Sequence, residues 1–425
     1  MERGYIFVSE KHYQRWRIIE LVDAGRLTLK EAATKLGISY RQAKRLRQAA
    51  CIKGASALAH GNRGRAPHNK TPEKMAERIL ALSRETYSLF NDSHFTQKLA
   101  EREGITVSRE TVRRLRRKSG IPSKRKRRPP RHHKRRERKA QEGLMMLWDG
   151  SPHRWFGPDG PELSLMAAID DATSKLLAAR LFPFEGSAGY LWLLDRVIAT
   201  YGVPLSIYHD RHGSLHRNDK HWSIEEQLAG TREPTQVGRA LKALEIQPIA
   251  ALSTQAKGRV ERLFETLQDR LVAELDLEKI REIDGANHFI ETRYIDTFNR
   301  DFAVPAREAE KAWRRLIPRS DLRRVLSFYY EATVGNDNAV RLGGLVIDIP
   351  PGPKRRSWAK CRVEVRQLLD GSWRVYYRDS IIAEHSSTTL SEPLRALRRR
   401  RARGADSCGW MYLGPNDKAA DYALI

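Results

Sequence analysis

Residues 163–182 of the chain read LSLMAAIDDATSKLLAARLF. Two mostly apolar runs, 163–170 and 175–182, flank the polar sequence DATS at 171–174. Short apolar runs that are joined by turn-forming residues are typical of antiparallel strands. We therefore expect a β-hairpin in the middle of the fold.

Further apolar segments lie on both sides of this hairpin. LMMLW at 144–148 comes before it, and LSIY at 205–208 and IQPIA at 246–250 come after it. The stretches between the last three strands, YLWLLDRVIATYG and VGRALKALE, have the apolar spacing of helices. A hairpin followed by alternating helices and strands predicts a mixed sheet with helices on its faces. Residues 141–300 should therefore form an α/β core.

Three carboxylates occur where such a sheet would bring them together. Asp149 directly follows the first strand, Asp210 follows the strand LSIY, and Glu261 lies in the helical sequence AKGRVERLFETLQDRL. Reactive groups gather at the carboxyl ends of neighbouring strands in an open α/β sheet. Clustered carboxylates repel one another unless a hard cation such as Mg²⁺ or Mn²⁺ binds them. We expect the three acids to hold two divalent ions, which together cut and join phosphodiester bonds.

The helix with Glu261 combines an apolar stripe for the sheet with a polar edge. Glu265 lies on the same edge, one turn further on, and is the main alternative third ligand. Lys257, Arg259 and Arg262 flank Glu261, where they could hold phosphate near the ions. They could equally balance the acids of the same helix.

Each acid alone has a simpler explanation, so the prediction depends on the combination. An aspartate after a strand is usually a turn former or a helix cap, and turn formation accounts for Asp170 and Asp171. His209 and His212 flank Asp210, and we expect them to shape its loop. The chain lacks a GxxxxGK[ST] phosphate loop, so no nucleotide cofactor is expected.

Composition indicates the kind of partner. The chain has 425 residues, a formal net charge of +26 and a sequence pI near 10.2. So large an excess of positive charge predicts a polyanionic partner, and we expect double-stranded DNA. No membrane partner is expected, because no run approaches the roughly 18 apolar residues that span a bilayer. Cys51, Cys361 and Cys408 have neither disulfide-framework nor zinc-ligand spacing, which favours a reducing cytoplasm.

Two helix-turn-helix patterns precede the core. In TLKEAATKLGISYRQAKRLRQA, at 28–49, Thr28 and Glu31 form a capping box, Gly37 ends the helix and Ser39 can cap a second one. The second helix would present to DNA Arg41, Lys44, Arg45 and Arg47. An ordinary helical hairpin with a solvated basic face is the alternative.

The second pattern is HFTQKLAEREGITVSRETVRRLRRKSG, at 94–120. Ser108 should cap its second helix, which would present Arg109, Arg113, Arg114 and Arg116. A basic, proline-containing segment then follows, and it should track the DNA backbone. Its candidate contacts are Lys124, Arg125, Lys126, Arg127 and Arg128.

The whole chain is expected to be a multidomain protein with all-α modules, an α/β core and a C-terminal β region. The expected segments are helix-turn-helix modules at 1–60 and 61–120, a basic linker at 121–140, the core at 141–300, a helical connector at 301–332, a small β-barrel at 333–390 and a basic tail at 391–425. Asp370 and Gly371, between two alternating runs, predict a hairpin within that barrel.

The core motifs resemble a known family. LMMLWDGSPHRWF, LSLMAAIDDATSKLLAARLFPFEGSAGYLWLLD, IYHDRHGSLHRN and AKGRVERLFETLQDRLVAEL are similar to insertion-sequence transposases with a DDE, retroviral-integrase-like core, in particular the ISNCY-type group. The resemblance covers most of residues 144–275. It implies an RNase H-like fold and a metal-binding triad of Asp149, Asp210 and Glu261. The C-terminal β region resembles the small barrel that follows the core in Mu-type transposases.

The resemblance also implies an activity. It implies recognition of terminal inverted repeats, cleavage at the element's ends, transfer of 3′ ends into target DNA, and a multimer on paired ends. Retroviral integrases carry a His/His/Cys/Cys zinc module, whose cysteines this chain lacks, so the helix-turn-helix modules must read the ends. We expect the protein in the bacterial cytoplasm, on the nucleoid when bound to DNA. A DNA-binding regulator and a structure-specific nuclease on the same core are the alternatives.

Overall fold

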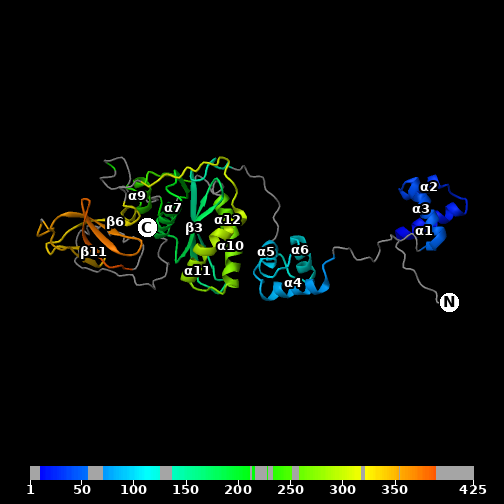
Figure 1. Cartoon of the computed structure of the whole chain (residues 1–425), viewed down its shortest axis with the longest axis horizontal. Coiled ribbons are helices and arrows are strands. Elements are labelled where there is room, and N and C mark those ends of the chain that lie inside the picture. Colours follow the sequence, from blue (N-terminus) through cyan, green and yellow to red (C-terminus); the bar gives the residue numbers. More distant parts are fainter. Residues whose placement is uncertain are drawn as a thin grey trace. The chain divides into compact units, whose positions relative to one another are not determined.

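A computed structural model of the chain describes residues 10–55, 70–124, 136–210, 213–215, 227, 233–250, 258–316, 321–353 and 355–388 (Figure 1). By its contacts the chain divides into two compact units, Met1–Ile79 and Leu80–Ile425. Arg125, Lys126, Arg127, Arg128, Lys257 and the basic tail lie outside the described residues. Over the part that is described, the structure contains no helix whose length and apolar content would let it cross a bilayer.

The first unit contains the predicted helix-turn-helix. Its helices are α1 (Glu10–Asp23), α2 (Leu29–Leu36) and α3 (Tyr40–Lys53). Thr28 and Glu31 form the predicted capping box of α2, and Gly37 ends that helix with φ 64°. The Ser39 side chain accepts a hydrogen bond from the Gln42 N–H at the start of α3. α1 had no counterpart in the sequence prediction.

The second helix-turn-helix pattern also forms two helices, α5 (Asp92–Arg102) and α6 (Arg109–Lys118). A further helix, α4 (Glu73–Glu85), precedes them. Asn91 caps α5 and Ser108 caps α6, each through a side chain that accepts a backbone N–H three residues on. Phe95 and Leu99 of α5 and Val112 of α6 are buried. The predicted cap at Ser108 is confirmed.

The core is a mixed five-stranded sheet. Its strands are β1 (Met146–His153), β2 (Leu163–Asp170), β3 (Leu176–Phe182), β4 (Ser206–His209) and β5 (Gln247–Ala250), in the order β3-β2-β1-β4-β5. β1, β2 and β3 are antiparallel neighbours, and β1, β4 and β5 are parallel ones. The predicted mixed sheet is therefore confirmed.

One strand boundary differs from the prediction. The first strand was expected to end before Asp149, but β1 continues to His153. Asp149 therefore lies inside the strand, opposite Ala167 of β2. The extension occurs because β2 is long enough to pair with β1 as far as His153 opposite Leu163.

Helices cover both faces of the sheet (Figure 1). On one face lie α7 (Ser187–Thr200) and α9 (Gln236–Ala243); on the other lie α10 (Gly258–Leu277), α11 (Ile283–Phe289), η3 (Ile290–Tyr294) and α12 (Ile295–Phe302). Side chains of β1 alternate between the two layers. Met146 and Trp148 pack with α7, and Leu147 packs with α10.

A helical connector was expected at 301–332. Among its described residues, only the last two residues of α12 and the short helix α13 (Leu322–Val325) are helical. Residues 303–316, here called the strap, run across the core without helical structure. Their backbone pairs with other segments instead: Arg314 and Val203 exchange hydrogen bonds of 2.8 and 2.9 Å, and the Ala312 N–H bonds the Glu142 carbonyl. Gly202, at φ +110°, permits this approach, because a Cβ there would lie 2.8 Å from the Arg314 carbonyl oxygen.

The C-terminal region is all-β but is not a closed barrel. Its strands are β6 (Phe328–Thr333), β7 (Ala339–Leu342), β8 (Leu345–Asp348), β9 (Arg362–Gln367), β10 (Trp373–Tyr377) and β11 (Ser380–His385). Among the described residues they form an antiparallel sheet, β11-β10-β9-β6, and a separate hairpin, β7-β8. The predicted barrel does not form among these strands, because no hydrogen-bond ladder joins the β7-β8 hairpin to the four-stranded sheet. The turn predicted at Gly371 is present, with φ +82°.

Candidate active site

The two aspartates belong to neighbouring parallel strands: Asp149 lies within β1, and Asp210 directly follows β4. Met146 pairs with Ile207 and Leu147 with Tyr208, so the same register continued for two residues sets Asp149 level with Asp210. Both side chains are half-buried. The structure therefore brings these two predicted acids to one edge of the sheet.

The hydroxyl group of Tyr190 is buried beside this edge, and the charges of both aspartates affect its pKa. Burial, then the negative charges of Glu185, Asp149 and Asp210, raise the pKa of Tyr190 far above its usual value. Tyr190 is fully buried on α7 and packs against the Trp148 ring at a centroid distance of 5.0 Å. A carboxylate pair next to an apolar wall of this kind makes a site that favours bound cations.

Glu261 lies in the first turn of α10 with its side chain exposed. Its neighbours Val260 and Leu263 belong to the same buried cluster as Leu147 of β1 and Tyr208 of β4. The helix therefore begins over the two strands that carry the aspartates. Within the described ranges, no three His, Cys, Asp or Glu side chains are close enough together to hold a metal ion.

The sequence analysis missed Glu185, which adds a further carboxylate to this neighbourhood. The Tyr190 hydroxyl donates a 2.5 Å hydrogen bond to Glu185 Oε1. The Glu185 side chain lies directly over Gly150: a Cβ there would be 2.8 Å from Glu185 Cγ and would overlap the carboxyl group. The sequence contained a clue to Glu185: this residue follows the carboxyl end of β3, and β3 runs in the same direction as β1. Functional side chains gather at such strand ends.

Arg259 was predicted to hold phosphate or to balance acids, and in the structure its side chain is bound to other groups of the core. Its guanidinium bonds the carboxylate of Asp171, which is fully buried, and the backbone carbonyl of Arg136. Burial lowers the pKa of Arg259, and Asp171 partly offsets this. Asp171 also binds the Arg136 guanidinium and the Lys139 N–H, so it does more than form a turn. The contact attaches the first turn of α10 to the β2–β3 turn.

Other residues around the site have local partners. Asp170 is buried and accepts hydrogen bonds from the Gly143 N–H and from Thr173, as expected for a turn residue. His209 is buried, and its Nδ1 lies 2.5 Å from the Asp210 carbonyl oxygen, in agreement with a role in shaping the loop. Arg262 is exposed, and its Nε donates to the Gly258 carbonyl. His212 lies outside the described residues.

The predicted DNA contacts of the first module lie on α3. Arg41, Lys44 and Arg45 are exposed there. Arg47 is half-buried, and its Nε lies 2.6 Å from Asp23 Oδ1 of α1. Three of the four candidates are therefore positioned as a recognition helix requires.

On α6, Arg109, Arg113 and Arg114 are exposed, but Arg116 is not. Arg116 is 4% exposed and donates to Asp92 Oδ1 at 2.9 Å and to the Phe90 carbonyl at 3.0 Å. Arg116 is therefore held within the module rather than presented on its surface, and helical spacing cannot reveal a partner on another helix. Lys124 is also engaged, with its Nζ 2.8 Å from Asp269 Oδ1 of α10.

Comparison with known proteins places the chain in a family. A family described as a homeodomain-like domain matches residues 9–59. The protein y4bF of Sinorhizobium fredii, which is named as a transposase, is 38% identical over 305 residues, covering 72% of this chain and 65% of y4bF. The transposase for insertion sequence IS1202 of Streptococcus pneumoniae is 34% identical over 328 residues, covering 68% of each chain. The chain thus spans about two thirds of the length of these relatives.

Two solved retroviral structures are among those that match parts of the chain, both with low TM-scores. The HTLV-2 integrase catalytic core domain in complex with magnesium has a TM-score of 0.25 and 16% identity, covering 37% of this chain and 88% of the core domain. A chain of the simian T-cell lymphotropic virus intasome in complex with the PP2A regulatory subunit B56 gamma has a TM-score of 0.30 and 14% identity, covering 74% of this chain and the whole of the other. The sequence relatives alone decide the family: this chain belongs to the insertion-sequence transposases, with the IS1202 transposase.

Proposed function

We propose that the protein binds double-stranded DNA at the terminal inverted repeats of its mobile element, cleaves there and transfers the 3′ ends into target DNA. In this proposal its copies assemble as a multimer on two paired ends, on the nucleoid of a bacterial cytoplasm. ISNCY-type membership is part of the same proposal. The sequence relatives support it, and so does the parallel pairing of β1 with β4, whose register continues to Asp149 and Asp210.

We assign two Mg²⁺ or Mn²⁺ ions to Asp149, Asp210 and Glu261. The donors fit, because carboxylate oxygens are the ligands that these hard cations prefer. The half-buried aspartates sit level with each other, so a cation would relieve their mutual repulsion. When bound, such ions activate a water or a 3′-hydroxyl and stabilise the leaving oxygen.

The chain's other residues orient these ligands and the DNA. The Asp171–Arg259 contact fixes the first turn of α10, and therefore the origin of the Glu261 side chain. Exposed Arg262 and the preceding Lys257 supply positive charge for a phosphate beside Glu261.

The two helix-turn-helix modules would recognise the ends. Exposed arginines and lysines of α3 can reach base edges in the major groove, as can those of α6. The segment 125–135 between the second module and the core would bind phosphates without reading sequence.

The test uses the full chain with labelled DNA that carries the flanking repeats of its gene, in Mg²⁺. We expect nicked ends and products joined to a target duplex, and we expect Asp210→Asn to abolish both. Glu265→Gln is the matched control, since it removes a carboxylate from the same helix edge one turn away.

Each outcome of this test is informative. Cutting without joining, on any DNA sequence, would support the structure-specific nuclease. Specific binding without any cut would support the regulator. Full activity of the Asp210→Asn variant would overturn the assigned site.

A further inference from the structure

Helix α5 of the second module lies between the recognition helix α6 and the core helix α10. One side of α5 packs on α6: Asp92 binds Arg116, whose guanidinium also lies over the Phe95 ring at 5.5 Å. The opposite side faces α10 and α12. α5 is therefore the structural connection between the DNA-reading helix and the catalytic core within this unit.

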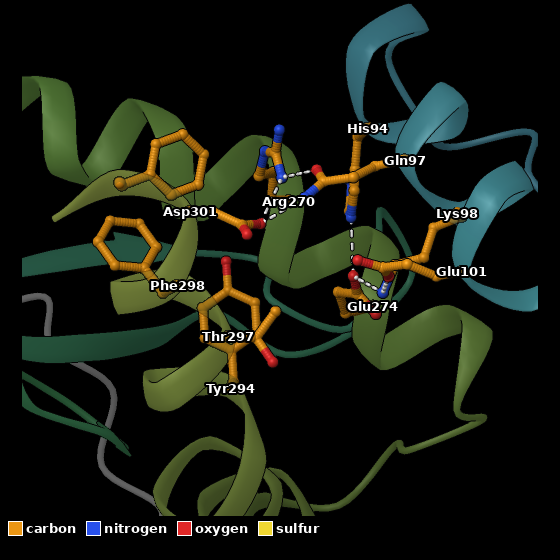
Figure 2. Close-up of a pocket in the computed structure, with 11 residues that line it drawn as sticks. His94, Gln97, Lys98, Glu101, Arg270, Glu274, Tyr294, Thr297, Phe298 and Asp301 are labelled. Carbon is orange, nitrogen blue, oxygen red and sulfur yellow. Dashed lines mark hydrogen bonds and ion pairs between the residues drawn. The ribbon is translucent and has the colours of Figure 1, made fainter. Parts of the chain in front are cut away.

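The centre of the α5–α10 contact is a buried charge cluster, shown in Figure 2. His94 Nε2 lies 2.7 Å, and Lys98 Nζ 2.8 Å, from the same oxygen of Glu274. All three residues are less than a tenth exposed. We call these three residues the clamp.

The pKa shifts of Glu274 and His94 favour hydrogen bonding between the clamp residues. Burial would raise the pKa of Glu274, but the hydrogen bonds from His94 and Lys98 outweigh it and hold the pKa below its usual value. Burial lowers the pKa of His94, and its bond to Glu274 offsets this only in part. At neutral pH a neutral imidazole and an ammonium therefore both donate to one carboxylate.

Polar contacts around the clamp extend the same interface. Figure 2 shows Gln97 pointing toward Arg270 and Asp301. Its amide nitrogen donates to Asp301 at 2.6 Å, and its oxygen accepts from Arg270 at 2.9 Å. Lys124 reaches Asp269, and Arg102 reaches Glu278. Interlocking contacts on both sides of a buried ion pair allow one docked orientation, since any shift leaves a buried charge unpaired.

Docking leaves the basic face of α6 open. Arg109, Arg113 and Arg114 are exposed in the same structure in which the clamp is closed. At its other end α10 carries Glu261, thirteen residues before Glu274. At 1.5 Å per residue that is roughly 20 Å along one continuous helix. The clamp thus holds the reading helix at a fixed offset from the catalytic end of α10.

We propose that the clamp sets the position of cleavage, by fixing the distance between the bases that α6 reads and the bond that is cut beside Glu261. His94, Lys98 and Glu274 are then positioning residues that determine where the element's end is cut. This inference rests on the proposed transposase function, and it predicts a change in the site of cleavage rather than a simple loss of activity.

The test compares Glu274→Gln with the wild-type full chain on end-labelled DNA, with products mapped at single-nucleotide resolution. The substitution keeps the side chain's shape but removes the buried carboxylate of Lys98, which retains only the more exposed Glu101 at 3.4 Å. The contact of α5 with α10 should therefore loosen. We expect cleavage to spread from one position to several neighbouring ones while binding to the end is kept. Asp276→Asn is the control, because it removes the same charge from α10 at an exposed pair with Arg281 and should leave the cleavage position unchanged.

A second variant separates release of the clamp from misfolding. Lys98→Met combined with Glu274→Gln removes both buried charges, and Glu101 keeps Arg300 as its partner at 3.4 Å. The double variant should therefore restore much of the wild-type cleavage pattern. Spin labels on cysteines at Arg114 and Glu265, in a background without other cysteines, report docking directly by their distance distribution. We expect a narrow distribution in wild type, a broad one in Glu274→Gln and a narrow one in the double variant.

The outcomes distinguish the two proposals. A wild-type protein that never cuts end DNA overturns the transposase function and the positioning role with it. A wild type that cuts at one position, with a Glu274→Gln variant that cuts at the same position and keeps a narrow distance distribution, overturns only the clamp.

Discussion

At the scale of single residues, the surroundings of Asp149 depend on Gly150 having no side chain. Gly150→Ala would push the Glu185 carboxyl group away and break its hydrogen bond to buried Tyr190. We expect the free energy of unfolding to fall by about 1–3 kcal/mol, as measured by urea denaturation. Combining it with Glu185→Ala should remove the overlap, so the double variant should lose less than the sum of the single losses.

The third metal ligand can be tested by exchanging one atom. Glu261→Gln should reduce DNA cleavage by more than the about 10–100-fold that loss of a metal site's outer partners costs. Glu265→Gln should retain activity. Isothermal titration with Mn²⁺ gives an independent readout, in which only the Glu261 variant should bind the ion more weakly. Equal losses from both variants would contradict the assignment.

Single residues also show what the sequence could and could not predict. Asp149 and Asp210 could be assigned to two strands because apolar runs mark those strands, although β1 continues four residues past Asp149. The ion pairs of Arg116 and Arg259 were not foreseen, because their partners, Asp92 and Asp171, are 24 and 88 positions away. Local spacing carries no information about such pairs, and a basic residue on a helix looks the same whether it is solvated or buried.

At the scale of elements, the packing of α5 on α10 should depend on pH. Both His94 and Glu274 have folded pKa values below their usual ones. The unfolded chain therefore binds more protons as the pH falls, and the folded state loses stability. The contribution from His94 is complete above its usual pKa near 6.5 and declines below it. The Glu274 contribution declines only at more acidic pH.

The measurement is the urea midpoint between about pH 5 and 8. His94→Gln should flatten the upper part of this dependence and leave the acidic part, since Glu274 keeps Lys98 as its partner. A wild-type midpoint that does not change over this range would contradict the prediction.

The strap supplies a second prediction at this scale. Gly202→Ala would place a methyl group 2.8 Å from the Arg314 carbonyl oxygen at φ +110°. We expect a loss of about 1–3 kcal/mol in the free energy of unfolding, from strain and from displacement of the strap. Gly285→Ala on helix α11, where a Cβ meets only Ile280 at 3.5 Å, should be neutral or slightly stabilising.

The elements were predictable where one pattern dominated. β2 was placed correctly at both ends, because its apolar run is bounded by turn residues. The sequence EAEKAWRRL at 308–316 has helix-forming residues throughout, yet it forms the strap. Backbone hydrogen bonds to Val203 and Glu142, and stacking of Trp313 on Tyr201 at 5.6 Å, outweigh a helical propensity of tenths of a kcal/mol per residue.

At the scale of the whole molecule, charge should govern DNA affinity. The segment 125–135 carries seven Lys and Arg residues. Changing all seven to Gln should weaken binding to every DNA sequence alike, and lower the slope of log K against log salt by up to about six. Arg45→Ala on α3 should instead weaken only the preferred sequence. Gel-shift titrations at several salt concentrations measure both effects, and identical effects would contradict the division of roles.

The overall architecture followed from the sequence only in part. The order of helical modules, α/β core and C-terminal β region was readable from composition and periodicity. The sequence did not show that the C-terminal sheet stays open. Whether a sheet closes into a barrel depends on hydrogen-bond pairing between strands that are distant in sequence. The α5–α10 contact was equally invisible, since it joins residues about 180 positions apart.

The strap also decides how the chain can be divided into fragments. A truncation at residue 302, just after α12, would strip Val203 and Glu142 of their backbone partners and uncover the Tyr201 ring. Such a fragment would expose an unpaired strand-like edge and would tend to aggregate. Anyone preparing the catalytic portion for crystallography or screening should therefore keep the chain at least as far as Leu316.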